Sequence, residues 1–330
     1  MEKSIYIFSN GEIKRKGNTI YFEGEREKSY IPIEACREIF IFGEVSFNKK
    51  FLEFISREEI LLHYFSHYGY YMGTFYPREH YNSGYMIIKQ AEYYIDIDKR
   101  IFLAARFVKG AIENILKVLN YYHRRGKDLI EEINKIEIFL NEVDNMKSID
   151  ELMAIEGNAR NIYYKSFDKI IKNNFFKFES RTKRPPKNRM NALISFGNSL
   201  IYTIVLSEIY KTHLDPRIGF LHTTNFRRFS LNLDIAEIFK PIIVDRVIFR
   251  LINKKQLKSN MFDSRVNKII LNDKGKKIFI QELENRLKTT IKYKKLNRSV
   301  SYRYLIRLEA YKLQKHLIGE ETYHPYIARW

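Results

Sequence analysis

Cysteine is almost missing from this sequence, since Cys36 is its only example among 330 residues. One cysteine excludes an internal disulfide and any zinc site built from several thiolates. The first residues, MEKSIYIFSNGE, lack the apolar run of a secretory signal. The longest apolar stretch, around Leu200–Leu206, is too short to cross a bilayer. These absences predict a cytoplasmic protein without a membrane segment.

The signatures of three common enzyme classes are also missing. The sequence contains no Walker A motif, no G-x-G-x-x-G and no G-x-S-x-G nucleophile elbow. ATPase, dehydrogenase and α/β-hydrolase functions therefore have no support, and we expect no nucleotide cofactor.

The positive charge is strongly uneven along the chain. The formal net charge is +19, but residues 1–85 carry 11 Lys/Arg and 12 Asp/Glu, a net charge of −1. Residues 86–330 carry the other 47 Lys/Arg and 27 Asp/Glu, a net charge of +20. With 45% hydrophobic residues, the chain is long enough for two globular domains. An anionic partner is expected to bind the second part.

Two basic runs without any acidic residue mark where such a partner binds. Residues 181–189 read RTKRPPKNR, with five basic residues, and residues 286–307 carry eight. The phosphate backbone of double-stranded DNA suits these runs, whereas the alternative is a merely solvated basic face. The predicted DNA contacts are Arg160, Arg181, Lys183, Arg184, Lys187, Arg189, Arg227, Arg228, Lys240, Arg286, Lys288, Lys292, Lys294, Lys295 and Arg298.

Hydrophobic periodicity changes near residue 84 and predicts an α+β fold. A β-rich domain is expected over residues 1–83 and a larger, mostly α-helical domain over 84–330. The turn pairs Asn10-Gly11 and Gly17-Asn18 separate short β-prone segments. The predicted strands are 4–8, 12–15, 19–22, 29–33, 38–42, 60–65 and 70–75, with a short helix over 48–57.

Helical periodicity dominates the second part. The predicted helices are 85–121, 128–143, 148–173, 191–212, 234–252, 262–270, 274–287 and 299–318. The basic run at 181–189 is expected in a loop, because Pro185-Pro186 favours extended backbone. A second loop is expected over residues 213–228.

Three carboxylates and one imidazole stand out in this basic chain. Glu156 lies in MAIEGNARNIYY, His222 in DPRIGFLHTTNFRRFSL, and Asp234 and Glu237 in LDIAEIFKP. Carboxylate oxygens suit Mg²⁺ or Mn²⁺, and an added histidine nitrogen favours Mn²⁺. A divalent metal site for phosphoryl transfer on nucleic acid is the natural hypothesis.

Each of these residues also has a purely structural interpretation. Glu156 could pair with Arg160 one helical turn along, and His222 could be an ordinary loop or core histidine. Asp234 and Glu237 share a helix face, but their D-x-x-E spacing also suits a capping box.

Taken together, the motifs resemble the CRISPR-associated adaptation integrase family, commonly called Cas-one. The resemblance covers nearly the whole chain and rests on IEGNARNIYY, RPPKNRMNALISFGNSLIY, DPRIGFLHTTNFRRFSLNLDIAEIFKP and the C-terminal SYRYLIRLEAYKLQKHLIGE. It implies that Glu156, His222 and Glu237 are metal ligands and that Asp234 is an acidic position near the metal. The last ligand is an Asp in some members, and here it is Glu237.

The resemblance also implies how the protein acts and with whom. The family inserts short DNA duplexes into a CRISPR array, where 3′-hydroxyl ends attack the repeat boundary. It implies a homodimer joined through the N-terminal domain, and a heterohexamer with the small dimeric partner Cas-two. Two other functions stay open on the residues alone: a metal-dependent endonuclease or branched-DNA resolvase, and a non-catalytic nucleic-acid-binding scaffold.

Overall fold

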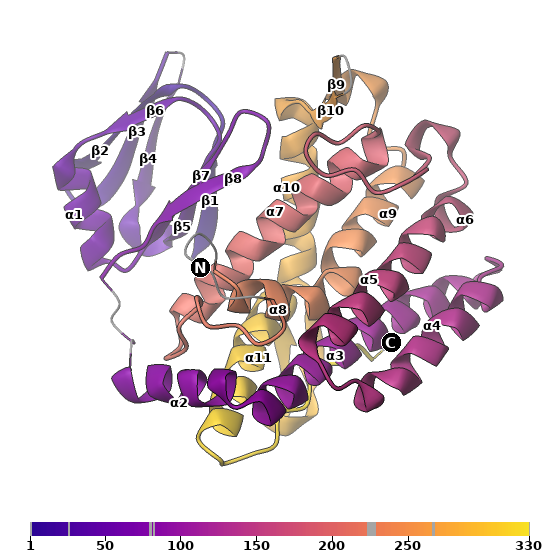
Figure 1. The fold of residues 1–330 in the computed structure, drawn as a ribbon. Coiled ribbons are helices and arrows are strands. Elements are labelled where there is room, and N and C mark those ends of the chain that lie inside the picture. Colours follow the sequence, from indigo (N-terminus) through magenta and orange to yellow (C-terminus); the bar gives the residue numbers. More distant parts are fainter. Residues whose placement is uncertain are drawn as a thin grey trace. The chain divides into compact units, whose positions relative to one another are not determined.

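The computed structural model describes residues 2–25, 27–78, 81, 83–222, 229–265 and 268–329. Two compact units divide the chain, Met1–Tyr81 and Asn82–Trp330. Strands β1 to β8 precede a mostly helical region, shown from indigo to yellow in Figure 1. The predicted α+β class is confirmed.

The first unit contains two four-stranded sheets and one helix. One sheet has the order β1-β5-β7-β8 and the other has the order β4-β3-β2-β6. Its elements are β1 (Lys3–Ile7), β2 (Gly11–Lys16), β3 (Thr19–Gly24), β4 (Lys28–Pro32), β5 (Cys36–Ile41), β6 (Val45–Phe47), α1 (Lys49–Arg57), β7 (Leu61–Phe65) and β8 (Tyr71–Phe75).

The predicted Gly17-Asn18 turn joins β2 to β3, where Lys16 pairs with Thr19. Gly17 has φ +60°, a conformation that glycine adopts without steric cost. The sequence prediction missed β6, a three-residue strand that pairs in parallel with β2. So short a strand carries too few alternating residues to give a pattern.

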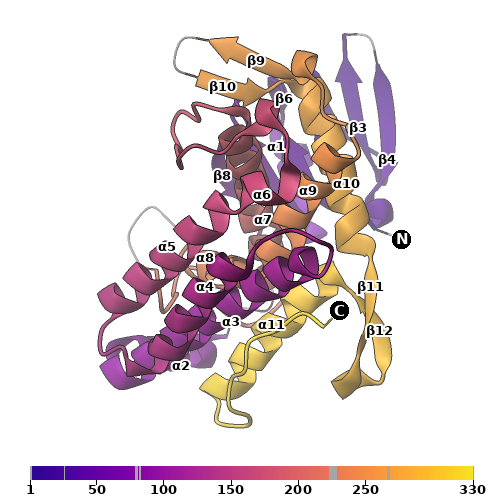
Figure 2. The ribbon, with the colours of Figure 1, turned by 90° about the vertical axis from the view of Figure 1, so that its right-hand side faces the viewer.

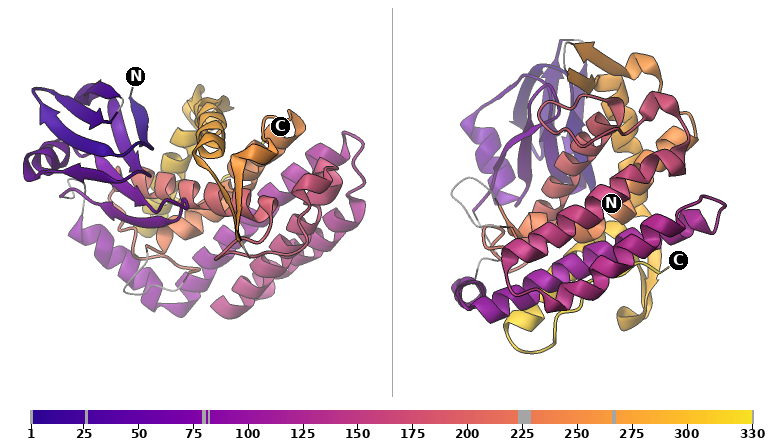
Figure 3. Two further views of the ribbon diagram at one scale, coloured as in Figure 1. Left: turned by 90° about the horizontal axis from the view of Figure 1, so that it is seen from above. Right: turned by 45° about the vertical axis from the view of Figure 1, so that its right-hand side comes forward.

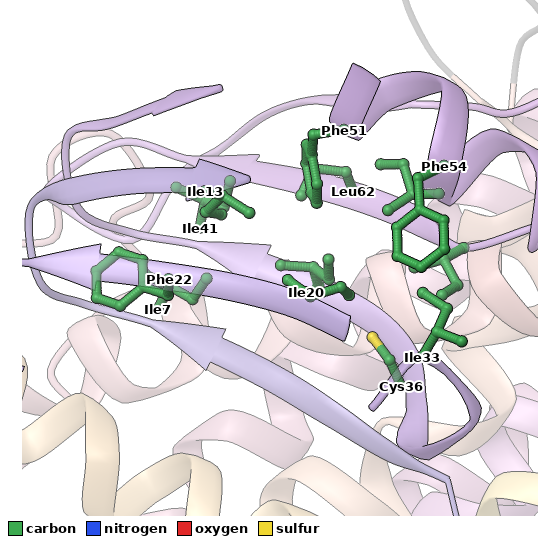
Figure 4. Close-up of a cluster of buried hydrophobic side chains, with 13 residues drawn as sticks. Ile7, Ile13, Ile20, Phe22, Ile33, Cys36, Ile41, Phe51, Phe54 and Leu62 are labelled. Atoms are coloured by element: carbon green, nitrogen blue, oxygen red, sulfur yellow. The ribbon is translucent and has the colours of Figure 1, made fainter. Parts of the chain in front are cut away.

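Isoleucine and phenylalanine side chains fill the core of the first unit. Figure 4 shows Ile13 and Phe22 from one sheet, Ile41 and Leu62 from the other, and Phe51 from α1 in one cluster. This packing buries the facing sides of the two sheets.

The second unit consists mainly of helices that pack on one another. Its helices are α2 (Gly84–Ile95), α3 (Ile97–His123), α4 (Ile130–Glu142), α5 (Ile149–Lys165), α6 (Phe167–Ile171), α7 (Arg189–Tyr210), α8 (Leu231–Phe239), α9 (Arg246–Asn253), α10 (Asp273–Lys288) and α11 (Tyr302–Leu317). Helices α3, α4 and α5, in purple and magenta, lie alongside one another (Figure 3). Helix α8 packs against α3, α7 and α11.

Several predicted helices divide in the structure. The predicted helix 85–121 breaks at Asp96, whose side chain accepts the Lys99 N–H at 3.1 Å and so caps α3. The helix predicted over 148–173 ends first at Lys165 and continues as α6. Periodicity alone does not reveal such breaks, because both halves keep an apolar face.

The predicted helix 234–252 also divides, and this break shapes the site. Helix α8 ends at Phe239, a π-helical turn follows over Pro241–Asp245, and α9 begins at Arg246. The Asp245 N–H donates to the Lys240 carbonyl at 3.1 Å, the i→i−5 bond of a π turn. Pro241 has no N–H to donate, so the ordinary helical ladder is interrupted there.

The helix predicted over 262–270 is wrong. These residues form the hairpin of β9 (Phe262–Arg265) and β10 (Lys268–Leu271). A second hairpin, β11 (Thr290–Tyr293) and β12 (Arg298–Ser301), replaces the start of the helix predicted at 299. The hairpins lie at the two ends of α10 (Figure 2). A contact distant in sequence supports the hairpin of β9 and β10, because the Ile269 N–H donates to the Pro186 carbonyl at 2.9 Å.

Helix α7 is the core helix of the second unit. It is the one helix of the described chain that is long and apolar enough to cross a membrane, but 78% of its most apolar window is buried inside the protein. Burial of that kind is typical of the central helix of a globular domain.

Candidate metal centre

Asp234 ties the loop that precedes α8 to the helix itself. Its Oδ2 accepts the N–H groups of Phe220 at 2.6 Å and Leu221 at 3.1 Å, and its Oδ1 accepts the His222 N–H at 3.0 Å. A Cβ atom on Gly219 would lie 2.8 Å from Asp234 Oδ2, so the loop needs glycine to approach so closely. The fully buried Asp234 carboxylate therefore sets the backbone of the loop.

The same carboxylate orients the His222 ring. His222 Nδ1 lies 2.8 Å from Asp234 Oδ1. Because an ionised carboxylate only accepts hydrogen bonds, Nδ1 carries the proton, and the neutral ring keeps a lone pair on Nε2. Histidines that ligate a metal usually donate their other ring N–H to a carboxylate or carbonyl oxygen, as His222 does to Asp234.

The capping-box interpretation of Asp234 and Glu237 is wrong. Helix α8 begins at Leu231 after the N-cap residue Ser230, so Asp234 already lies inside the helix. Asp234 and Glu237 then occupy successive turns of one face. Asp234 accepts bonds from the preceding loop instead of capping α8.

Glu237 is buried among polar side chains from α7 and α8. Lys240 Nζ donates to its two carboxylate oxygens at 2.7 and 2.8 Å, and the Tyr202 hydroxyl donates to Oε1 at 3.4 Å. Lys240 Nζ also lies 3.2 Å from the Tyr202 oxygen. A buried carboxylate needs such partners, because removing it from water costs on the order of several kcal/mol.

Arg160 joins the two glutamates that were predicted to share a metal. Its Nε donates to Glu156 Oε1 at 2.6 Å, and its Nη2 donates to Glu237 Oε2. The structural interpretation of Glu156, a pair with Arg160 on α5, is therefore confirmed. The same guanidinium brings Glu156 and Glu237 together although 81 positions separate them in the sequence.

We use the word cluster for the charged side chains described above, which are Glu156, Arg160, His222, Asp234, Glu237 and Lys240. Their charges shift two pKa values in opposite directions. Burial would raise the pKa of Glu237, but Arg160, Lys240 and His222 hold it well below its ordinary value. Burial would lower the pKa of His222, but the hydrogen bond and charge of Asp234, with the charges of Glu237 and Glu156, raise it. The charges of His222 and Glu237 therefore act on one another, and the charge of Glu156 acts on His222.

The donor types of this site suit a divalent metal. Two carboxylates and one histidine nitrogen, with the ring fixed by Asp234, are ligands that Mn²⁺ or Mg²⁺ accepts. Within the described part of the chain, however, no three His, Cys, Asp or Glu side chains lie together closely enough to hold a metal ion. The Arg160 guanidinium between Glu156 and Glu237 gives the physical reason, because it engages the oxygens that a metal would use.

The predicted DNA contacts fall into two groups by exposure. Arg160 and Lys240 lie buried in the cluster, where their partners are carboxylates. Arg286 is partly buried and donates to the Ile242 carbonyl at 2.8 Å from Nη2. Arg227 and Arg228 lie outside the described residues. The exposed members are Lys183, Arg184, Lys187, Lys288, Lys292, Lys294, Lys295 and Arg298.

The basic run 181–189 is an ordered loop, as predicted. The buried Asn191 side chain accepts from Arg181 Nη1 at 3.0 Å and from the Thr182 N–H at 3.2 Å. The Thr182 hydroxyl accepts the Lys187 N–H at 2.9 Å, and Arg189 stacks over the Phe175 ring at 3.8 Å. Arg181 and Arg189 thus hold the loop, while Lys183, Arg184 and Lys187 face solvent.

Sequence reasoning assigned no role to two residues that the structure places beside the cluster. Tyr202 contacts both Glu237 and Lys240 from α7. Asp245 is fully buried, and the charges of Arg160 and Lys240 act on it. The sequence signal for Asp245 was an acid between apolar residues in PIIVDRVIF, because such an acid lies on a buried face.

Comparisons with known proteins show the family of this chain. A CRISPR-associated endonuclease Cas1 of Thermodesulfovibrio yellowstonii is 63% identical over 330 residues, which are the whole of both chains. The structure of TM1797, a CAS1 protein from Thermotoga maritima, has a TM-score of 0.89 and 48% identity, with 98% of this chain and 99% of that chain covered. A casposase bound to integration product shares the fold, with a TM-score of 0.88, 20% identity and coverage of 99% and 96%. Residues 5–285 match the family described as CRISPR associated protein Cas1, and the chain belongs to that family.

Proposed function

We propose that this chain is the integrase of CRISPR spacer acquisition and catalyses a metal-dependent DNA transesterification. The 3′-hydroxyl ends of a short duplex attack phosphodiesters at the boundary of the CRISPR repeat. One phosphodiester replaces another, so the reaction needs no ATP. The observation that carries this proposal is that Arg160 joins Glu156 to Glu237 and that the charges of both glutamates act on His222, although these residues lie far apart in the sequence.

The cluster supplies the groups that such a reaction requires. Glu156, Glu237 and the Nε2 atom of His222 would hold Mn²⁺ or Mg²⁺. When bound, the metal supplies charge stabilisation at the phosphoryl oxygen and at the attacking or leaving oxygen. Asp234 keeps His222 in the tautomer that offers Nε2, and the glycine at 219 allows that approach.

The exposed basic residues would position the two DNA duplexes. Lys183, Arg184 and Lys187 lie on the ordered loop that Asn191 anchors, which makes them a preformed phosphate contact. The hairpin β11–β12 carries Lys292 and Arg298 on exposed positions. Phosphate contacts of this kind set orientation and carry no sequence information themselves.

The expected assembly follows from the family and is part of the same proposal. Residues 1–83 would join two copies in a homodimer, and two such dimers would flank one dimer of the small partner, Cas2. Double-stranded DNA, both the incoming duplex and the repeat, completes the complex. The cytoplasm is the proposed compartment, since the CRISPR array lies there in prokaryotic cells.

A strand-transfer assay tests the proposal. Purified protein, with and without Cas2, is mixed with a labelled short duplex, a supercoiled repeat plasmid and Mn²⁺. We expect label to join the plasmid covalently, and we expect Glu156→Ala and His222→Ala to abolish joining. Glu137→Ala and His324→Ala are matched controls, because both residues are exposed and lie outside the cluster.

Endonuclease activity is a second candidate, because a relative with 63% identity is named a CRISPR-associated endonuclease. Water would then replace the 3′-hydroxyl as nucleophile in the same site. Metal-dependent cutting without joining, in the presence of Cas2, would favour the nuclease. DNA binding that neither mutation changes, with no chemistry at all, would favour a scaffold.

A further inference from the structure

Three polar atoms near the cluster are buried and have no hydrogen-bond partner. They are Arg160 Nη1, Asp245 Oδ2 and the Tyr163 hydroxyl. Buried polar atoms are nearly always paired, and leaving one unpaired costs about 1–3 kcal/mol, or more for a charged group. One unpaired donor of a cation and one unpaired acceptor of a carboxylate in the same region therefore need an explanation.

Asp245 lies buried at the end of the π-helical turn. The charges of Arg160, Lys240 and Glu237 all act on it, and its other close neighbour is Tyr163. Tyr163 lies on α5, three positions after Arg160, and faces the Asp245 carboxyl without making a hydrogen bond of good geometry. Asp245 Oδ2 is thus buried without a hydrogen-bond partner in a region where the charge of Arg160 acts on the carboxyl.

Arg160 and a divalent metal compete for the same oxygens. Glu156 Oε1 and Glu237 Oε2, the acceptors of Arg160, belong to the two carboxylates expected to ligate the metal. A guanidinium carries one charge and fixed donors, whereas a divalent ion carries two charges and needs direct contact with oxygen. A divalent ion on these carboxylates would compete with Arg160 for their oxygens and repel its positive charge, so metal binding favours a move of Arg160 to another acceptor.

We propose that Arg160 is an exchangeable counterion, which neutralises Glu156 and Glu237 until a divalent metal takes them, and that Asp245 accepts its guanidinium after the exchange. This inference rests on the proposed metal site and adds two positioning residues to it. After the exchange the metal pairs with the glutamates, and Arg160 pairs with Asp245. Without Asp245, displaced Arg160 would stay buried beside the metal with no anion of its own.

The state of Asp245 agrees with a reserved acceptor. Burial raises the pKa of Asp245 to about 7, against the lowering by Arg160 and Lys240. A carboxyl already engaged by a guanidinium has a pKa below its ordinary value, as Glu237 does. Asp245 is therefore near these cations but not paired with them.

Direct Mn²⁺ binding to the full-length protein tests the exchange. Free Mn²⁺ is measured by electron paramagnetic resonance in a titration at pH 7.5, for the wild type, Asp245→Asn, Arg160→Gln and the double variant. We expect Asp245→Asn to weaken Mn²⁺ binding about tenfold, the effect of losing one hydrogen bond between charged groups. Arg160→Gln should tighten binding, because it removes the competitor.

The double variant separates exchange from simple electrostatics. If Asp245 acts by accepting Arg160, Asp245→Asn has no further effect once Arg160 is glutamine. Equal weakening by Asp245→Asn in both backgrounds would overturn the proposal, since Asp245 would then act only through its charge. Unchanged affinity in the single variants would overturn it as well.

Two additional measurements distinguish a folding defect from a change in metal binding. Thermal unfolding in EDTA identifies any variant that does not fold, and Arg160→Lys then serves in place of Arg160→Gln. Lysine keeps the charge but cannot bridge both glutamates, so it should also bind Mn²⁺ more tightly than the wild type does. If the wild type transfers strands and Asp245→Asn has no effect, the exchange proposal is wrong and the integrase proposal stands. If the wild type does not bind Mn²⁺, both the exchange proposal and the metal-dependent integrase proposal are wrong.

Discussion

Asp234 shows how much one side chain contributes at the residue scale. Its two oxygens accept three backbone N–H groups and lie beside the His222 ring, so they have little capacity left for a metal. Asp234 is thus a positioning residue for His222. Glu156 and Glu237 have the freer geometry, because their partners are side chains that can move.

The Asp234–His222 pair predicts how Mn²⁺ binding depends on pH. His222 binds a metal only when Nε2 is deprotonated, and its pKa is raised by Asp234 despite the lowering effect of burial. Affinity should therefore rise as the pH increases through that raised pKa. Asp234→Asn removes the charge that raises it, so the midpoint should move to lower pH, as followed by Mn²⁺ titrations between about pH 5.5 and 8.5. An unchanged midpoint would show that Asp234 does not set the His222 pKa.

The raised pKa of Asp245 predicts that the stability of the protein also depends on pH. Its pKa rises from 3.8 to about 7 in the folded protein, mainly through burial. Between these values the unfolded state loses the proton first, so the free energy of unfolding falls as pH rises from about 4 to 7.

Asp245→Asn removes this titration. Compared with the wild type in EDTA, the variant should therefore gain relative stability between pH 5 and pH 8, on the order of a few kcal/mol. Urea unfolding at both values measures the difference. A gain that does not grow with pH would contradict the raised pKa.

At the scale of elements, helix α7 depends on close packing at Gly197. A Cβ atom there would lie 2.4 Å from Val244 Cγ1 and 2.9 Å from Phe279 Cζ, both of them buried. Gly197→Ala should lower the free energy of unfolding by about 1–3 kcal/mol through overpacking. Chemical denaturation measures the change.

Gly157 is the matched control within α5, because a Cβ atom there meets nothing within 4 Å. Gly157→Ala should raise stability by about 0.5–1 kcal/mol, since alanine favours the helix. Destabilisation of similar size in both variants would show that packing around α7 is not the cause.

Element types were predictable where local pattern and local contacts agree. The β-prone segments 19–22 and 38–42 became β3 and β5, and the apolar segment 191–212 became α7. The segment 262–270 was not predictable, because its hairpin depends on the distant bond between Ile269 and Pro186. The π-helical turn at Pro241 also escaped periodicity, since apolar residues continue through it.

At the scale of the whole molecule, the positive charge of the second unit should dominate DNA binding. Lys292 and Lys294 are exposed on or beside the hairpin β11–β12. If each neutralises one phosphate, Lys292→Ala with Lys294→Ala should reduce the log-log salt slope by about 2. Fluorescence anisotropy over a range of salt concentrations measures this slope on a short duplex.

Lys254→Ala with Lys274→Ala is the control of equal charge. These residues are also exposed, but they lie outside both acid-free runs. The control should leave the slope nearly unchanged. Equal reductions in the two double variants would mean that net charge, and not the basic hairpin, determines affinity.

The sequence by itself determined the α+β class and the family, and it predicted the four residues of the candidate site. These follow from periodicity and from ordered motifs, which are local properties of the chain. Only the tertiary structure placed Arg160 between Glu156 and Glu237 and turned Asp234 toward the loop instead of the helix end. The tertiary structure also placed a free oxygen of Asp245 near this cluster. Such partners follow from packing between helices far apart in sequence, and buried charges take whichever partner that packing brings within reach.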